Sequence, residues 1–144
     1  LAPIGGGGLI TGVSVAAKHI KPSIRVIGIQ TSACPAMVKA LEDRVCYMDF
    51  PSQPSICDAL VGGVGEIPYK MAGQCIDDIV LVEEESVKEA VLFLMDKEKV
   101  IAEPAGAVGV AAVMAEPELF KNKNVAIIIS GGNLDFSLIK SIQR

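Results

Sequence analysis

Two spacings of apolar residues alternate along the chain, and together they predict an α/β fold. Short, nearly continuous apolar runs bounded by Gly, Pro or charged residues are typical of buried strands. They occur at residues 1–4 (the end of a strand), 25–30, 78–82 and 125–129. Between them, apolar residues recur every three or four positions, which predicts helices. These helices are expected at residues 9–20 and 36–45, from residue 86 onward and after residue 104.

Strands that alternate with helices are typical of a parallel sheet with flanking helices. The run Val125–Ile129 has no polar residue, so we expect it to be a central strand covered on both faces. Ser86 and Glu89 have the spacing of a capping box, which predicts a helix start there. Several glycines and a proline interrupt residues 56–72, which we interpret as a broken helix and loop.

Length and composition indicate part of a domain. The chain has 144 residues, about the length of one domain, and 51% of them are hydrophobic. An apolar composition of this kind suits a domain whose surface meets a further segment. The chain opens at Leu1 without a Met. We therefore expect the polypeptide to start upstream, and residues 1–144 to form a single incomplete α/β domain.

Charge and composition argue against several partners. The 13 basic and 17 acidic residues are scattered and only 4% of residues are aromatic, so we expect no nucleic-acid partner. No segment reaches the ~20 apolar residues that span a bilayer, so we expect no membrane partner. The four cysteines lack Cys-x-x-Cys spacing, which indicates reduced thiols in a cytoplasmic protein.

The loop Gly5–Gly8 has the composition of a phosphate-binding turn. Four glycines between a strand and a helix let backbone N–H groups converge on an anion, and the helix start adds its positive dipole end. Leu9 and Ile10 stand where a P-loop needs Lys and Ser or Thr, and the dinucleotide pattern also fails. The loop therefore suits an isolated phosphate, with a plain tight turn as the alternative.

Two further motifs follow the glycine loop. Ser130–Asn133 (Ser-Gly-Gly-Asn) follows the apolar run 125–129, and ligands bind at the carboxyl ends of strands in open α/β sheets. Its alternative is an ordinary β-turn. Glu103 precedes a helix rich in small residues, where its carboxylate could line a pocket or cap the helix.

The three motifs Pro3–Leu9, Glu103–Gly106 and Ser130–Asn133, in this order, resemble the fold type II family of pyridoxal-phosphate (PLP) enzymes. This family includes threonine dehydratases and serine racemases, and Asp77–Ile79 followed by a helix is similar to it as well. The resemblance covers nearly all of the chain. It implies a partial three-layer parallel sheet, like the large domain of those enzymes.

The resemblance also implies PLP as the cofactor and a role for each matching residue. The phosphate would be held by the backbone of Gly5, Gly6, Gly7, Gly8 and Leu9. Ser130 would hydrogen-bond the pyridine nitrogen, and Glu103 would lie beside the ring. A neutral hydroxyl at that nitrogen leaves it largely unprotonated, which suits removal of an α-proton and loss of a β-hydroxyl.

The chain departs from the family pattern at several places. Ala59 follows Asp58 where the family usually has Gly, and its methyl group would crowd the cofactor edge. Some relatives bind a divalent cation in the region that matches Gln30–Ala36, which has no carboxylate here, so we predict no metal site. The family's Schiff-base lysine lies upstream of the glycine loop. We expect it before Leu1 and therefore assign no catalytic residue within the chain.

The complete protein is thus expected to be an ammonia-lyase that converts a β-hydroxy amino acid, threonine or serine, to a 2-oxo acid and ammonia. The alternatives are an amino-acid racemase of the same family, a non-catalytic fragment that binds PLP or phosphate, and a packing partner for a separate N-terminal half. The fragment alone is expected to be inactive, and the family implies self-association. We interpret His19, the cysteines and Glu83–Glu85 as residues without a catalytic role.

Overall fold

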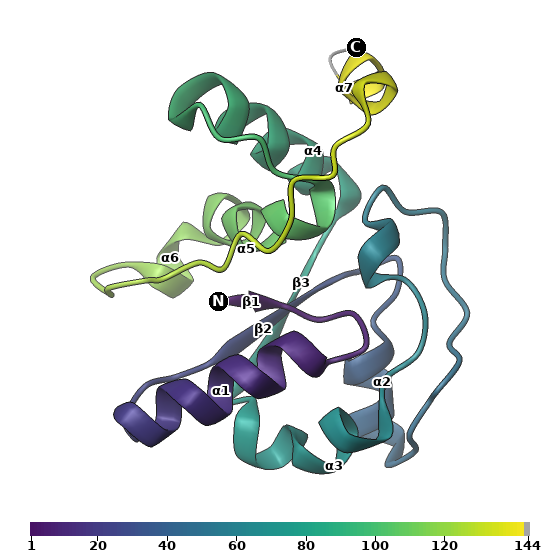
Figure 1. Ribbon diagram of the computed structural model, residues 1–144, viewed down its shortest axis with the longest axis vertical. Helices are drawn as coiled ribbons and strands as arrows, with labels where there is room; N and C mark the ends of the chain where they lie inside the picture. Colours follow the sequence, from purple (N-terminus) through teal and green to yellow (C-terminus); the bar gives the residue numbers. More distant parts are fainter. Residues whose placement is uncertain (143–144) are drawn as a thin grey trace.

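A computed structural model describes residues 1–142 as helices packed on both faces of a small parallel sheet (Figure 1). The strands are β1 (Ala2–Pro3), β2 (Ile27–Thr31) and β3 (Asp78–Val82). The helices are α1 (Gly8–Ile20), α2 (Ala36–Asp43), the 3₁₀ turn η1 (Asp58–Leu60), α3 (Glu66–Cys75), α4 (Glu84–Phe93) with its π-helical extension η2 (Leu94–Glu98), α5 (Pro104–Ala115), α6 (Pro117–Phe120) and α7 (Phe136–Ile142).

The strands lie side by side in the order β1-β2-β3, and both pairs are parallel. Ile29 of β2 is the central position, since it aligns with Pro3 on one side and with Val80 on the other. Helices α4 and α5 cover one face of the sheet, while α1, α2 and α3 lie on the other (Figure 1). The predicted α/β fold with flanking helices is confirmed.

Helix α5 forms the centre of one apolar layer. It is apolar all round, and every residue from Pro104 to Ala112 is buried. Such a helix belongs in a core rather than at a surface. Gly106 and Gly109 have no side chain on the face that meets the segment before α7, so the backbone of Gly131 can lie directly on the helix.

The apolar run Val125–Ile129 differs from its prediction as a covered central strand. It runs parallel to β1, but only Leu1 pairs with it: the Leu1 amino group donates to the Ala126 carbonyl at 2.6 Å, and Ile128 N–H donates to the Leu1 carbonyl at 3.0 Å. Within residues 1–142 no strand lies on its other side. Val125 and Ile129 are therefore 38% and 39% exposed, and the segment is extended without becoming a regular strand.

Other element boundaries also differ from the sequence pattern. The predicted capping box at Ser86 is wrong, because α4 already begins at Glu84 and Ser86 lies inside it. Part of the ambiguous stretch 56–72 belongs to a continuous helix, α3. Pro68 is tolerated there because it lies in the first turn, where its missing N–H would have no helical partner.

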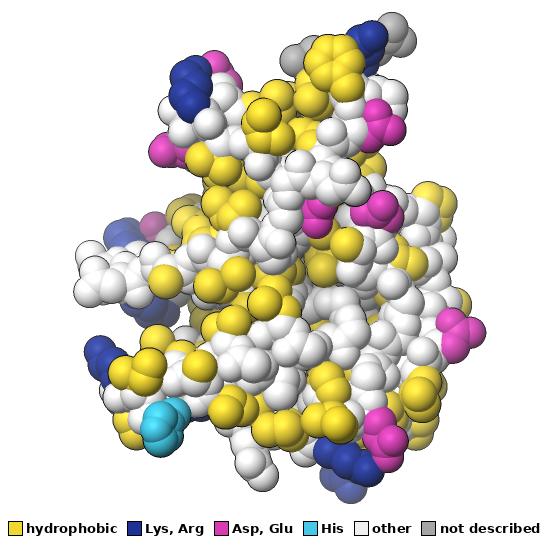
Figure 2. Space-filling model, viewed as in Figure 1, with side chains coloured by type: hydrophobic (Ala, Val, Ile, Leu, Met, Phe, Trp, Pro, Cys, Tyr) yellow, Lys and Arg dark blue, Asp and Glu magenta, His cyan; other side chains and the backbone are white. Residues whose placement is uncertain are grey.

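Charged side chains are dispersed over the face of the molecule that Figure 2 shows. Figure 2 shows lysines, arginines and carboxylates as separate groups on the face in view, with apolar side chains between them. This distribution agrees with the absence of a basic stripe in the sequence. Over the described residues, no helix combines the length and the apolar character that crossing a membrane requires.

Candidate cofactor site

The glycine loop connects β1 to α1 and turns sharply. Gly7 adopts the left-handed conformation (φ 88°), which residues with a side chain rarely adopt. A Cβ atom on Gly5 would come within 2.8 Å of the Ala59 carbonyl oxygen. The first α1 hydrogen bond joins Thr11 N–H to the Gly7 carbonyl at 3.1 Å. The N–H groups of Gly8 and Leu9 therefore have no carbonyl partner within the helix, and they point outward from its start.

All the residues that the sequence singles out for cofactor binding line one pocket of about 200 Å³. The predicted residues in its lining are Gly5, Gly6, Gly7, Gly8, Leu9, Glu103 and Ser130. Pro3, Ala59, Leu60 and Ala105 complete it. The pocket lies at the carboxyl end of β1, where α/β sheets bind ligands. The fold thus brings together motifs that are far apart in the sequence.

Glu103 connects two parts of this pocket rather than capping α5. Its side chain makes no capping bond to the helix, although its backbone lies at the N-cap position. Its carboxylate instead accepts a hydrogen bond from Asn133 N–H at 3.1 Å, and its N–H donates to the Gly131 carbonyl at 3.1 Å. The carboxylate packs against Gly131, where a Cβ atom would collide with it. These contacts fix the turn that presents Ser130.

The turn η1 supplies the pocket wall, which we define as Ala59 and Leu60. Ala59, which stands where the family usually has Gly, thus belongs to the lining. The preceding Cys57 is fully buried, and desolvation, together with the charge of Glu84, raises the pKa of its thiol to about 12. A thiol with that pKa stays protonated at neutral pH, which agrees with the interpretation of Cys57 as non-catalytic.

Glu84 has a structural role that the sequence pattern did not indicate. The run Glu83–Glu85 predicts a solvated helix start, and Glu83 and Glu85 are indeed exposed. Glu84 is half-buried and accepts hydrogen bonds from Thr31, from Ser55 and from Ile56 N–H. Its partners come from distant parts of the chain, so no local pattern could have identified it. His19, by contrast, is exposed at the end of α1.

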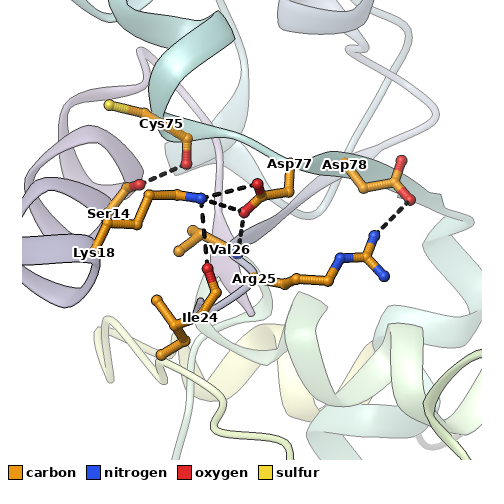
Figure 3. Close-up of polar contacts among 8 residues, drawn as sticks. All are labelled: Ser14, Lys18, Ile24, Arg25, Val26, Cys75, Asp77 and Asp78. Carbon is orange, nitrogen blue, oxygen red and sulfur yellow. Dashed lines mark hydrogen bonds and ion pairs between the residues drawn. The ribbon is translucent and has the colours of Figure 1, made fainter. Parts of the chain in front are cut away.

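Helix α1 is fixed at its other end by a polar cluster (Figure 3). Lys18 Nζ contacts both carboxylate oxygens of Asp77, at 2.8 and 2.7 Å, and Val26 N–H donates to the same carboxylate at 2.6 Å. Ser14, fully buried, donates its hydroxyl proton to the Cys75 carbonyl. This cluster joins α1 to the start of β3, so the helix that begins at the glycine loop is held at both ends.

Gln30 occupies the region where the sequence predicts no metal site. It is fully buried, and its side-chain oxygen accepts from Met37 N–H at 3.1 Å and from Val38 N–H at 3.3 Å. Its side-chain nitrogen lies 3.4 Å from the Ile4 carbonyl oxygen. The amide thereby links the end of β1 to the start of α2. The absence of a metal site stays a prediction.

The pocket residues fit a phosphate group. Side chains are absent where the loop approaches the wall, and the amides at the start of α1 can donate to an anion at the positive end of the helix dipole. The lining carries no lysine or arginine among residues 1–142, so backbone N–H groups are its donors on the loop side. Glu103 and Ser130 line the same pocket and are available to the remainder of a cofactor.

Comparison with known proteins places the chain in a family. Residues 1–131 match the family model described as pyridoxal-phosphate dependent enzyme. The chain is 43% identical over 143 residues to an L-threonine ammonia-lyase of Thermotoga maritima, a match that covers 99% of this chain and 35% of that protein. It is 36% identical over 146 residues to a catabolic L-threonine dehydratase of Escherichia coli, covering 99% of this chain and 44% of the relative.

Solved structures give the same result. The processed form of threonine deaminase isoform 2 from Solanum lycopersicum superimposes with a TM-score of 0.87 at 33% identity, over 98% of this chain and 42% of that one. Maize serine racemase superimposes with a TM-score of 0.86 at 29% identity, over 99% of this chain and 46% of the racemase chain. The chain spans less than half the length of each of these relatives. On the family match and the shared fold, the chain belongs to the family of pyridoxal-phosphate dependent enzymes.

Proposed function

We propose that this chain is the phosphate-binding part of a PLP-dependent ammonia-lyase that converts L-threonine or L-serine to a 2-oxo acid and ammonia. One observation carries the proposal: a single pocket gathers the glycine loop, Glu103 and Ser130. The similarity to L-threonine ammonia-lyase and L-threonine dehydratase supports the reaction and the substrate class. We further propose that residues 1–144 are one incomplete α/β domain.

In this proposal the backbone of Gly5–Gly8 and the Leu9 amide hold the phosphate. Hydrogen bonds from N–H groups at a helix start suit an anion, because the dipole adds favourable electrostatic energy of about 0.3–1 kcal/mol per charge. Gly5 and Gly7 are needed because a side chain at either position would strike Ala59 or Pro68. The loop thus positions the cofactor without a charged side chain.

Ser130 and Glu103 act on the other part of the cofactor. When bound, PLP supplies an electron sink for the Cα atom of the amino acid. The Ser130 hydroxyl serves as a neutral hydrogen-bond partner of the ring nitrogen, so it does not compel that nitrogen to be protonated. Glu103 holds the Ser130–Asn133 turn in place through Asn133 and borders the ring. The lysine that bonds the cofactor is expected in another segment of the protein.

A racemase is the second candidate, favoured by the similarity to maize serine racemase. Both reactions begin with removal of the α-proton, and they differ in whether a β-hydroxyl leaves or a proton returns to the other face.

We also propose that the protein acts in the cytoplasm as a homo-oligomer. Within residues 1–142 all four cysteines are free thiols, which supports a reducing compartment.

The test is to incubate the whole protein that contains this chain with PLP and L-threonine, L-serine or D-serine, and to measure ammonia, 2-oxo acid and the enantiomer of serine. We expect ammonia and 2-oxo acid in equal amounts from L-threonine or L-serine. D-Serine formed from L-serine as the main product would favour the racemase. PLP binding without turnover of any of these substrates would leave only the non-catalytic binding role.

A further inference from the structure

We propose that Glu84 is a positioning residue for the phosphate pocket, which it shapes through the loop before η1 without touching the cofactor. This inference rests on the proposed PLP site and adds a residue that lies outside the pocket lining. Glu84 is in the first turn of α4 and does not line the pocket. Its role follows from a chain of hydrogen bonds that ends at the pocket wall.

The first link of this chain is the carboxylate itself. Oε1 of Glu84 accepts from the Thr31 hydroxyl at the end of β2 and from the Ser55 hydroxyl at 2.8 Å, while Oε2 accepts from Ile56 N–H at 2.7 Å. One partner belongs to the rigid sheet and two belong to the loop. Because bonds to an ionised acceptor are about twice as strong as neutral ones, the carboxylate is an effective clamp.

The second link runs from the loop to the wall. Ser55 Oγ, which donates to Glu84, also accepts from Cys57 N–H at 2.9 Å. The Cys57 carbonyl in turn accepts from Leu60 N–H at 2.8 Å and closes η1. Ala59 and Leu60 then form the wall, and the Ala59 carbonyl oxygen lies 2.8 Å from the place that a Cβ atom on Gly5 would take. The position of this wall therefore sets the space left for the glycine loop.

Few other hydrogen bonds hold the segment before η1, although Ile56 and Cys57 pack against the core. No helix or regular strand lies between α2 and η1, and the nearest backbone tie in the loop joins Gln53 N–H to the Ala33 carbonyl at 2.9 Å. With Glu84 removed, Ser55 and Ile56 lose their acceptor, and the wall is free to shift against the glycines. The buried Leu60 would still anchor the turn, so we expect a looser pocket rather than an unfolded chain.

Two neighbouring carboxylates allow a matched test in the whole protein. Glu84→Met keeps the volume and replaces both carboxylate oxygens by a thioether, which is only a weak acceptor, whereas Glu84→Gln keeps one carbonyl oxygen. Glu83→Met makes the same chemical change one residue away, where the exposed carboxylate accepts, among residues 1–142, only from the Ser32 hydroxyl at 2.7 Å. The dissociation constants of PLP and of pyridoxal, which lacks the phosphate, are measured for each variant well below its melting temperature.

We expect Glu84→Met to weaken PLP binding about 10-fold while pyridoxal binding changes little, since loss of a few hydrogen-bond acceptors is worth at least this factor. The PLP affinity of Glu84→Gln should lie between that of Glu84→Met and that of the unchanged protein. Glu83→Met should bind PLP as tightly as the unchanged protein. Equal weakening of PLP and pyridoxal by Glu84→Met, or no weakening of either, would overturn the positioning role.

A second variant covers the case in which Glu84→Met does not fold. Ser55→Ala removes the hydroxyl that joins Glu84 to Cys57 N–H, and it should also reduce PLP affinity relative to pyridoxal. Combined with Glu84→Gln, its effect should be less than additive because both variants break one chain of bonds. Strict additivity would contradict the chain. If the unchanged protein itself binds no PLP, the proposed function fails. If the unchanged protein binds PLP and the Glu84 variants bind it equally well, only the positioning role of Glu84 fails.

Discussion

At the scale of single residues, the pocket depends on glycines that leave room and on polar groups that face it. Gly5 is restricted by close approach to backbone, since a Cβ atom there would lie 2.8 Å from the Ala59 carbonyl oxygen. Backbone cannot yield as a flexible side chain can. A single methyl group at this position therefore has to displace either the glycine loop or the wall.

We predict that Gly5→Ala lowers PLP affinity at least about 10-fold, since moving donors away from the phosphate loses about 1.4 kcal/mol or more. Gly12→Ala is the matched control, because the new methyl group on α1 would meet no atom within 4 Å and lies outside the pocket. It should bind PLP normally and stabilise the helix by about 0.5–1 kcal/mol. A titration followed by absorbance measures both. Normal affinity in Gly5→Ala would count against the loop as the phosphate site.

Ser130→Ala should reduce turnover of L-threonine about 10- to 100-fold, the range that follows from losing a hydrogen bond of about 1.4–2.8 kcal/mol in the reacting state. PLP should remain bound, because the proposed phosphate contacts lie on the glycine loop. Steady-state kinetics and a cofactor titration on the same sample separate these effects. Unchanged turnover would remove Ser130 from the site.

At the scale of elements, the contact between Lys18 of α1 and the Asp77 carboxylate makes the stability of the protein depend on pH. Desolvation disfavours its charged form, but the hydrogen bonds from Lys18 and from Val26 N–H outweigh that effect and lower the pKa of Asp77 below its ordinary value of 3.8. A group with a lowered pKa in the folded state adds stability above its unfolded pKa. That stability is lost as the pH falls below about 3.8 and through the folded pKa.

Asp77→Asn should therefore destabilise the protein by about 1–3 kcal/mol near neutral pH, the usual value for hydrogen bonds to a charged group. The difference from the unchanged protein should shrink below about pH 4. Asp78→Asn is the control, since Asp78 makes one exposed ion pair with Arg25 at 3.8 Å (Figure 3), a type worth about 0–1 kcal/mol. Thermal unfolding at about pH 6 and about pH 3.5 tests this. A pH-independent effect of Asp77→Asn would contradict the role of the ion pair.

The pattern of apolar residues predicts the positions of most helices and strands. It fails where the formation of an element depends on its neighbours in the fold. Helix α1 and strand β3 have the predicted positions because their signals are local: an apolar face with Pro22 beyond it, and an apolar run preceded by acidic residues. The run Val125–Ile129 looks like a central strand, yet a strand forms only along a paired neighbour, and within residues 1–142 Leu1 alone supplies one.

At the scale of the whole molecule, the site combines residues that the sequence indicates with residues that only the fold brings in. The family resemblance assigns Gly5–Gly8, Glu103 and Ser130 to one cofactor site, and all of them line one pocket. Leu60 and Glu84 carry no such signal, because their positions depend on contacts between segments far apart in the sequence. A helix start with three glutamates is ordinarily solvated, and only the fold singles out Glu84.

A comparison of PLP with pyridoxal tests whether this chain holds the phosphate of PLP. Binding of each to the cofactor-free whole protein is followed by calorimetry under the same conditions. If the glycine loop holds the phosphate, PLP should bind at least about 100-fold more tightly, which corresponds to about 2.8 kcal/mol or more. Equal affinities for PLP and pyridoxal would mean that the loop is only a turn and that the pocket does not bind phosphate.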